Sequence, residues 1–262
     1  MHEHLEHPLP AALTPYVRGI QGYRITGCAP GTHIGLPSAD VTCVFDLGAG
    51  LDLSGLGLSG MHHFQASFSG LHTSPATIHH DGSQHGIMLY LTPPGLHELF
   101  GIPAAELVGS AVDLTDLLGH LGTDLTERVR RAPGWSCLDV LCQILLARLP
   151  EQPSDDVAGQ VWRRLARADG LVSVRSLADE SGWSVRYLRS RFTTEFGVAP
   201  KTVCRLMRFE RSVEAVRGCT TLSRAAYLTG YADQAHLARE WREFAGVAPS
   251  RWLVRGGFAP AE

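Results

Sequence analysis

LADESGWSVRYL, at residues 177–188, and AAYLTGYADQAHL, at residues 225–237, are two copies of one pattern. Each copy is followed by a similar closing segment, FGVAP at residues 196–200 and AGVAP at residues 245–249. Leu188 and Leu237 are separated by the same interval as Pro200 and Pro249, so the copies are 49 residues apart. A helix, a Gly-aromatic turn, a second helix and a Gly-x-x-Pro stop form a helix-turn-helix unit, and two units in series indicate a protein that reads DNA.

The first copy predicts a short helix capped by Ser173 and ended by Gly182, which permits a left-handed turn residue. Ser184 then caps the second helix of the unit. At about 100° per residue, Leu188 and Phe192 face the core of that helix pair. Side chains on the outward face can reach base edges or phosphates. The predicted DNA contacts of this copy are Ser184, Arg186, Arg189, Ser190 and Thr193.

In the second copy Asp233 caps the second helix, while Leu237 and Trp241 take the core positions. Gln234 is placed to read adenine, and Arg239 to read guanine or to bind phosphate. An isolated exposed arginine is ordinarily a solvated charge, but repeated placement on the second helix of two units favours DNA contact. The predicted contacts of this copy are Gln234, Ala235, His236, Arg239 and Arg242.

The segment between the copies, residues 202–218, carries apolar residues at helical spacing. About 16 residues at about 1.5 Å each form a rod of about 24 Å. Such a rod can hold the two second helices, hereafter the recognition helices, about one DNA turn of about 34 Å apart. Both could then enter successive major grooves on one face of the duplex.

The net charge differs between the two halves of the chain. Residues 1–154 contain 6 Arg and Lys against 14 Asp and Glu, a net charge of −8, and residues 155–262 contain 17 against 12, a net charge of +5. A basic half suits phosphate binding. The sequence has no long apolar run and no leader-like N-terminus, which predicts a cytoplasmic protein without membrane contact. Its six cysteines include no Cys-x-x-Cys, so neither a zinc ribbon nor a disulfide framework is indicated.

The N-terminal half has a different pattern. Residues 41–47 and 87–91 alternate with period two, and glycines are dense at residues 48–60, which favours a small barrel or sandwich over a doubly wound sheet. After Pro93-Pro94 helical segments are expected at residues 96–100, 104–107, 114–118 and 124–131. The segment Leu138–Leu149 carries a broad apolar stripe. That stripe either packs on the β-rich part or meets the same helix of a second subunit in a homodimer.

The predicted fold class is α+β and multidomain. A cupin-like β domain with helices precedes an all-α domain with two helix-turn-helix motifs joined by a linker helix. The expected boundaries are residues 1–150 for an effector-binding or dimerisation domain, 151–156 for a Pro-rich linker, 157–256 for the DNA-binding domain and 257–262 for a tail.

The residues at 157–255 resemble the C-terminal domain of the AraC/XylS family of bacterial transcription regulators. Both Gly-aromatic turns, both Gly-Val-Ala-Pro closings and the run from Gly230 to Leu237 carry the resemblance. It implies seven helices, a double-stranded DNA partner, contacts with RNA polymerase during activation and a small-molecule effector bound by the N-terminal half. One departure is Ser190, because relatives commonly have arginine two residues after the position of Leu188. Either backbone anchoring is weaker there, or Arg189 and Arg191 compensate.

Twelve of the 13 histidines precede residue 121, and six are concentrated at residues 62–85. Neighbouring histidines on a strand face opposite sides, so only one of each pair can enter a pocket. The predicted effector contacts are His62, His72, His80, His85 and Tyr90.

A metal-responsive regulator, or a cupin-type metalloenzyme fused to DNA-binding helices, is the alternative function. A metal site needs two to four converging ligands, and Asp81 could supply a carboxylate. The sequence has no His-x-His followed by Glu, and no nucleophile stands in a recognisable catalytic context. We therefore expect no catalytic residues, no metal ligands and no cofactor.

Overall fold

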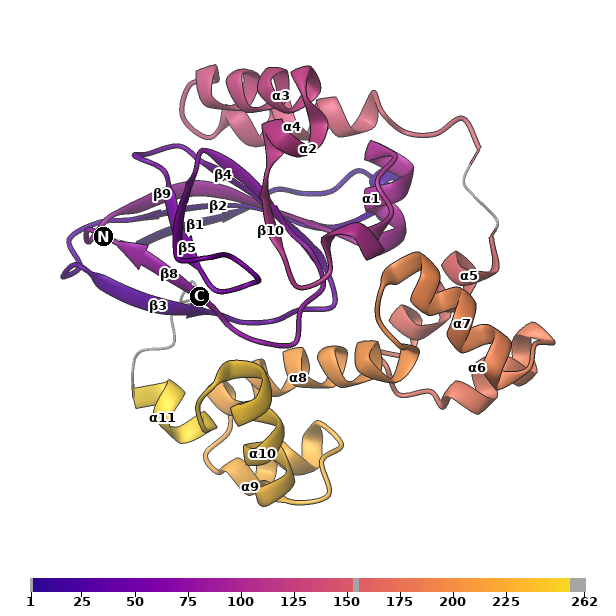
Figure 1. Cartoon of the computed structure of the whole chain (residues 1–262). Coiled ribbons are helices and arrows are strands. Elements are labelled where there is room, and N and C mark those ends of the chain that lie inside the picture. The colour runs from indigo at the N-terminus through magenta and orange to yellow at the C-terminus, as the bar shows by residue number, and fades with distance from the viewer. Residues whose placement is uncertain (1, 153–155, 255–262) are drawn as a thin grey trace.

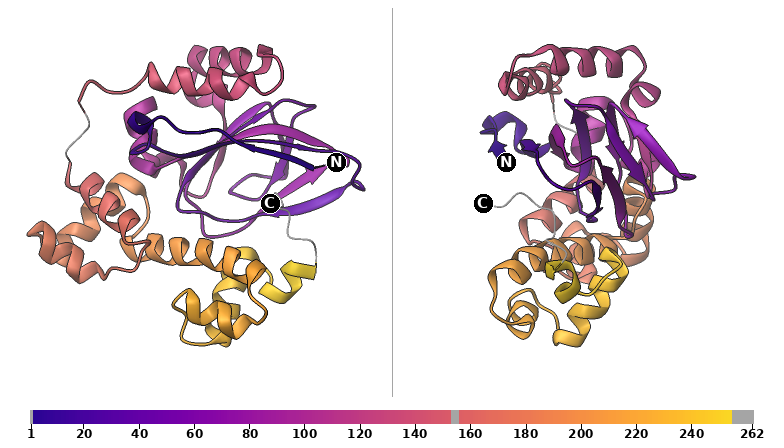
Figure 2. Two further views of the ribbon diagram at one scale, coloured as in Figure 1. Left: turned by 180° about the vertical axis from the view of Figure 1, so that it is seen from behind. Right: turned by 90° about the vertical axis from the view of Figure 1, so that its left-hand side faces the viewer.

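The computed structural model describes residues 2–152 and 156–254. These residues form a β-rich domain followed by seven helices, the number that the family resemblance implies (Figure 1). The helical domain lies along one side of the β-rich domain in every view (Figure 2). The predicted tail at 257–262, residues 255–256 of the predicted DNA-binding domain and residues 153–155 of the predicted linker lie outside the described residues.

The larger sheet has six antiparallel strands, and its buried side chains come from the predicted alternation. Val41, Cys43 and Phe45 point into the main core and are almost fully buried. In spatial order the strands are β1 (His2–Glu6), β2 (Val17–Ile25), β9 (Gln84–Leu91), β4 (Val41–Asp46), β7 (Ala66–Ser69) and β10 (Ala111–Asp113).

A second, smaller antiparallel sheet faces the first. Leu51, Leu53 and Phe64 form a small core with Val44 of the larger sheet, so the two sheets pack face to face. This arrangement agrees with the predicted barrel or sandwich. In spatial order the strands are β3 (Gly31–Gly35), β8 (Ala76–His80), β5 (Leu51–Ser54) and β6 (Met61–Phe64).

Helices cover the outer face of the larger sheet. The stripe on α4, which contains Leu138, Leu141 and Leu145, is buried in the main core, so it packs within the chain. This helix ends at Leu146, before the predicted end at Leu149. Leu149 directly precedes Pro150, and helical geometry is disfavoured for a residue before proline. The elements of this region are η1 (Ala11–Leu13), α1 (Pro93–Phe100), η2 (Ala104–Leu107), α2 (Leu114–Leu118), α3 (His120–Arg131) and α4 (Ser136–Leu146).

The C-terminal domain places a long central helix, α8, between two groups of shorter helices (Figure 1). α8 begins at Pro200, two residues before the predicted start, because proline is favourable in the first turn of a helix. The elements are α5 (Val157–Arg167), α6 (Val174–Ser181), α7 (Val185–Phe196), α8 (Pro200–Gly218), α9 (Leu222–Leu228), α10 (Gln234–Ala245) and α11 (Pro249–Val254).

Polar contacts join the domains. The backbone N–H of Ala39 donates to Oε1 of Glu210 on α8 at 2.9 Å. His97 on α1 lies 3.2 Å from the carboxylate of Glu195 on α7. The β-rich domain therefore contacts both the central helix and the first recognition helix. Among the described residues, none of the helices has the length and apolar character needed to cross a membrane.

Candidate nucleic-acid interface

The first helix-turn-helix unit consists of α6 and α7. Gly182 adopts φ 71° between them, and the hydroxyl of Ser184 accepts a hydrogen bond from the N–H of Tyr187 at 3.2 Å, as the predicted cap requires. Leu188 and Phe192 are buried, and Phe192 stacks on Trp162 of α5. The other predicted contact residues of this helix are exposed: Arg186, Arg189, Ser190 and Thr193.

The second unit consists of α9 and α10. The carboxylate of Asp233 accepts a hydrogen bond from the N–H of His236 at 2.6 Å and so caps α10. Leu237 and Trp241 are fully buried, as the sequence pattern predicts. The exposed predicted contact residues of this helix are Gln234, Ala235, Arg239 and Arg242.

The predicted arginines on the recognition helices have no ion-pair partners among the described residues. None of Arg186, Arg189, Arg239 and Arg242 pairs with a described carboxylate. Unpaired guanidinium groups on exposed helix faces are available to phosphates and guanine edges. Arg191 of α7 also lacks such a pair, so this property alone does not single out base-reading residues.

A hollow of about 1230 Å³ lies between the two units. Arg189 of α7 and Arg239 of α10 both line it, so the two recognition helices present side chains to the same space. α8 contributes Lys201, Arg205, Arg208 and Arg211 to the lining. With six arginine and lysine side chains against Glu240 and Glu243, the hollow has a positive balance that favours an anionic ligand.

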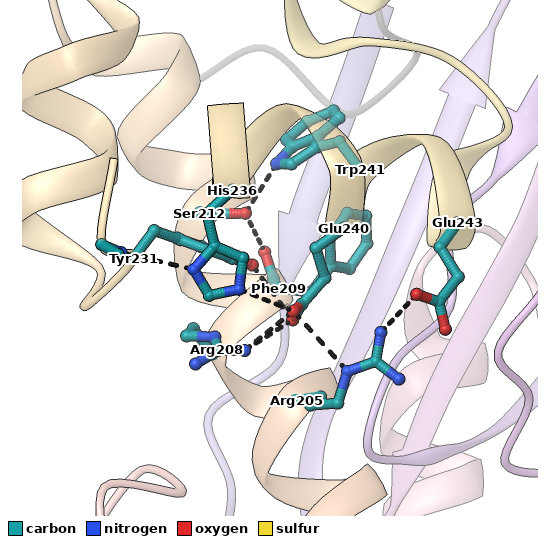
Figure 3. Close-up of polar contacts among 10 residues, drawn as sticks. Arg205, Arg208, Phe209, Ser212, Tyr231, His236, Glu240, Trp241 and Glu243 are labelled. Atoms are coloured by element: carbon teal, nitrogen blue, oxygen red, sulfur yellow. Dashed lines mark hydrogen bonds and ion pairs between the residues drawn. The ribbon is translucent and has the colours of Figure 1, made fainter. Parts of the chain in front are cut away.

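A buried ion pair fixes the second unit on α8 (Figure 3). Glu240 of α10 is 4% exposed, and its oxygens lie 2.8 and 3.1 Å from Nη2 of Arg208. Arg205 lies 3.6 Å away through Nε, and the Tyr231 hydroxyl donates to the same carboxylate at 3.4 Å. Because a buried carboxylate needs several such partners, α10 has one favoured orientation against α8.

Two of the predicted contacts have additional partners inside the unit. His236 is partly buried: its Nδ1 accepts from the N–H of Ala232 at 3.4 Å, and its Nε2 lies 3.8 Å from Glu240. The hydroxyl of Ser223 donates to Oε1 of Gln234 at 3.1 Å. Gln234 is nevertheless exposed at the start of α10, whereas His236 is turned toward the interior of the unit.

The five predicted effector contacts have different immediate neighbours. His62 stacks on Phe64, and Nδ1 of His72 lies 2.7 Å from the carbonyl oxygen of Ser74. His80 lies beside His33, while His85 contacts Trp135 and Arg24. The hydroxyl of Tyr90 donates to the sulfur of Met88 at 3.2 Å. In the described part of the chain, no three His, Cys, Asp or Glu residues are grouped so that they could hold a metal ion.

Sequence reasoning missed the Glu240 network and the contacts between the domains. Arg208 and Glu240 are 32 residues apart, so no local periodicity links them. One signal was available: Glu240 stands three residues after Leu237 and one before Trp241, on the core face of its helix. A carboxylate in an apolar stripe indicates a buried partner of opposite charge.

Comparison with known proteins agrees with this geometry. A family model described as a helix-turn-helix domain matches residues 177–255. No curated protein sequence matches the chain.

Structures of ToxT from Vibrio cholerae have the same fold. One matches with a TM-score of 0.52 and 12% identity over 90% of this chain and 98% of that chain. Another, described as bound to an unsaturated fatty acid, has a TM-score of 0.51 and 12% identity over 94% and 96%.

The family match identifies a helix-turn-helix domain at residues 177–255, and the structural similarity shows that the chain shares the two-domain fold of ToxT. Both findings agree with the resemblance to the AraC/XylS family that the sequence shows.

Proposed function

We propose that this protein regulates transcription in the cytoplasm by inserting α7 and α10 into successive major grooves of one operator. The observation that carries the proposal is that Arg189 and Arg239, from different recognition helices, line the same hollow. The 19 residues of α8 span about 28 Å, which suits two grooves about 34 Å apart.

The proposed contacts fall into two kinds. Arg186, Arg239 and Gln234 have the side chains suited to purine edges in the major groove. The hydroxyl groups and the other arginines suit the phosphates that position a protein on the duplex. The proposed backbone contacts are Ser184, Arg189, Ser190, Thr193 and Arg242, while Ala235 would pack against a thymine methyl group and His236 would contact DNA only after turning outward.

Selection of binding sites from a random DNA pool tests the proposal. We expect enrichment of two short half-sites at one fixed spacing close to one helical turn, about 10 base pairs. Enrichment of one isolated half-site would contradict the double insertion. Absence of any enrichment at low salt would contradict DNA recognition altogether.

We also propose that the N-terminal domain binds a small-molecule effector between its two sheets. Val44 faces the smaller sheet, and its cross-strand partners Met88 and Ser67 lie on the same face. Tyr90 and Tyr23 share this face by their strand pairing, and both remain partly accessible. The buried hydroxyl of Ser67 has no hydrogen-bond partner in the described structure, which suits a polar group of a ligand.

These residues extend the predicted effector site, of which Tyr90 is a member, beyond the scattered histidines. The fatty acid described for ToxT gives a first probe, because the intersheet face combines apolar and hydroxyl groups. Calorimetric titration with an unsaturated fatty acid and with a panel of aromatic acids should give saturable binding for at least one compound. That binding should weaken in Tyr90→Ala and persist in His62→Ala; equal loss in both variants would contradict the intersheet site.

One chain carries both recognition helices, so we propose that a monomer suffices for operator binding. The apolar stripe of α4 is buried within the chain, which removes the main sequence argument for a homodimer at Leu138–Leu149. Light scattering of the protein–operator complex should give one chain per duplex. Contact with RNA polymerase remains an expectation from the family resemblance, and transcription reconstituted with purified components tests it.

A further inference from the structure

The face of α8 that lines the hollow carries more positive charge than two groove contacts require. Lys201, Arg205, Arg208 and Arg211 follow one another at intervals of four, three and three residues, so they share one side of the helix. Glu210, which binds the β-rich domain, is on the opposite side. The basic face therefore points away from the N-terminal domain and into the space between the two recognition helices.

We propose that this face of α8 is a third DNA-binding element, which binds the sugar-phosphate backbone between the two major-groove contacts. In the free protein the carboxylate of Glu243 pairs with Arg205, and a DNA phosphate replaces this carboxylate when the duplex binds. The inference rests on the proposed double insertion of α7 and α10. If α7 and α10 bind one duplex, the sugar-phosphate backbone between the two grooves faces α8, because α8 lies between the two helices.

The four basic residues differ in how firmly they are held. Arg208 is bound by Glu240, which is 4% exposed, so it serves the packing of α10. The side chain of Arg211 donates to the carbonyl oxygen of Asp169. Lys201 is exposed and pairs with no carboxylate among the described residues.

Arg205 lies between these extremes (Figure 3). Its Nη2 lies 2.5 Å from the carboxylate of Glu243, and its guanidinium lies over the ring of Phe244 at 4.8 Å. Arg205 is 27% exposed and Glu243 55% exposed, so this pair reaches the solvent. An exposed ion pair contributes little net free energy, whereas arginine binds phosphate through two parallel hydrogen bonds. Phosphate can therefore displace Glu243 while the ring of Phe244 keeps the guanidinium in place.

A matched pair of variants tests the exchange. Glu243→Gln removes the shorter of the two ion pairs of Arg205 within the hollow and leaves its contact with Glu240 at 3.6 Å. Glu214→Gln, the control, frees Arg217 on the same helix, where Glu214 binds Arg217 at 3.0 Å outside the lining of the hollow. Both substitutions remove one negative charge and one arginine ion pair, and the arginine concerned lines the hollow only in Glu243→Gln.

We expect Glu243→Gln to bind operator DNA about 3- to 10-fold more tightly at about 0.15 M salt, because it removes both a competitor and a repulsive charge. Glu214→Gln should stay within about twofold of the unaltered protein. Lys201→Gln and Arg205→Gln should each reduce the slope of log affinity against log salt by about 1, as expected for one lost phosphate contact. Thermal midpoints recorded for each variant ensure that folded proteins are compared.

The outcomes separate this inference from the proposed function. If the unaltered protein binds no DNA, the proposed function itself is wrong. If it binds DNA, but Glu243→Gln equals Glu214→Gln and both salt slopes are unchanged, then only the third element is wrong. Saturable binding of inorganic phosphate to the free protein, lost in Arg205→Gln, would instead assign the hollow to a free anion and overturn the backbone assignment.

Discussion

The two helix-turn-helix units share a sequence pattern but are held in place by different parts of the molecule. The second unit is tied to α8 by the buried Glu240–Arg208 pair. The first unit has the exposed Arg191 at the position equivalent to Glu240, 49 residues earlier, and instead contacts the β-rich domain through Glu195 and His97. Gly197, at the end of α7, also lies close to the backbone of Ala105 and the side chain of Val108 in that domain. The second unit also approaches the β-rich domain, where a Cβ at Gly246 would lie 3.5 Å from Pro75, so the polar contact of Glu195 with His97 is what sets the first unit apart.

Removal of the buried carboxylate should give the largest difference between the units. Glu240→Ala leaves Arg208 without its partner and should lower the free energy of unfolding by about 3 kcal/mol. Arg191→Ala, at the equivalent exposed position of the first unit, should change it by less than about 0.5 kcal/mol. Chemical denaturation measures both, and equal effects would contradict the contrast.

The pH dependence of stability tests how α8 is held by the β-rich domain. Burial raises the pKa of Glu210 from 4.5 to about 7, with the charge of Asp40 as a second cause. Burial likewise raises the pKa of Asp40 from 3.8 to about 6, opposed by Arg18. The folded protein thus keeps protons that the unfolded chain has already released, so the free energy of unfolding falls between about pH 4 and pH 7.

Glu210→Gln keeps a neutral group at this contact at every pH. It should remove about 1–3 kcal/mol of that fall, so the variant gains stability relative to the unaltered protein as pH approaches 7. Denaturation curves recorded from pH 4 to pH 8 give the comparison, with the exposed Glu214→Gln as control. Parallel curves for Glu210→Gln and the unaltered protein would contradict a raised pKa of Glu210 in the folded protein.

The recognition helices themselves should contribute unequally. Arg239 is equivalent to Ser190 in the first copy, so the second helix has a guanidinium where the first has a hydroxyl. Arg239→Ala should cost about 1–3 kcal/mol of binding free energy and relax preference at one base pair. Ser190→Ala should cost less than about 1 kcal/mol. Titration of variant operators measures both, and an Arg239→Ala loss that is uniform across all sequences would assign this residue to the backbone.

The smallest expected effect concerns the contact between α1 and α7. His97 is 51% exposed, so His97→Ala should change global stability by less than about 0.5 kcal/mol. Hydrogen exchange should nevertheless increase at the C-terminal turn of α7 and remain unchanged in α10. An equal increase in both helices would show that the β-rich domain does not act on the first unit alone.

The sequence patterns predicted the features that depend on residues close together in the chain. Caps such as Ser184 and Asp233, the left-handed Gly182 and the buried faces of α7 and α10 all follow from spacing along one helix. The strands at residues 41–47 and 87–91 follow from alternation in the same way.

The remaining features depend on residues far apart in sequence. Glu240 meets Arg208 and Glu210 meets Ala39 because helices and domains pack in one particular way, which no periodicity encodes. The predicted effector histidines have different immediate neighbours, since His62 lies beside Phe64 and His85 beside Trp135. The DNA-contact and effector assignments themselves stay predictions.

The fixed separation of the two recognition helices is the central claim, and helical phasing tests it most directly. Binding should be measured on operators whose half-site spacing is changed by five base pairs, about half a helical turn. The account predicts that affinity falls to the level of a single half-site, because α8 holds α7 and α10 toward one face of the duplex. Equal affinity for both spacings would contradict it.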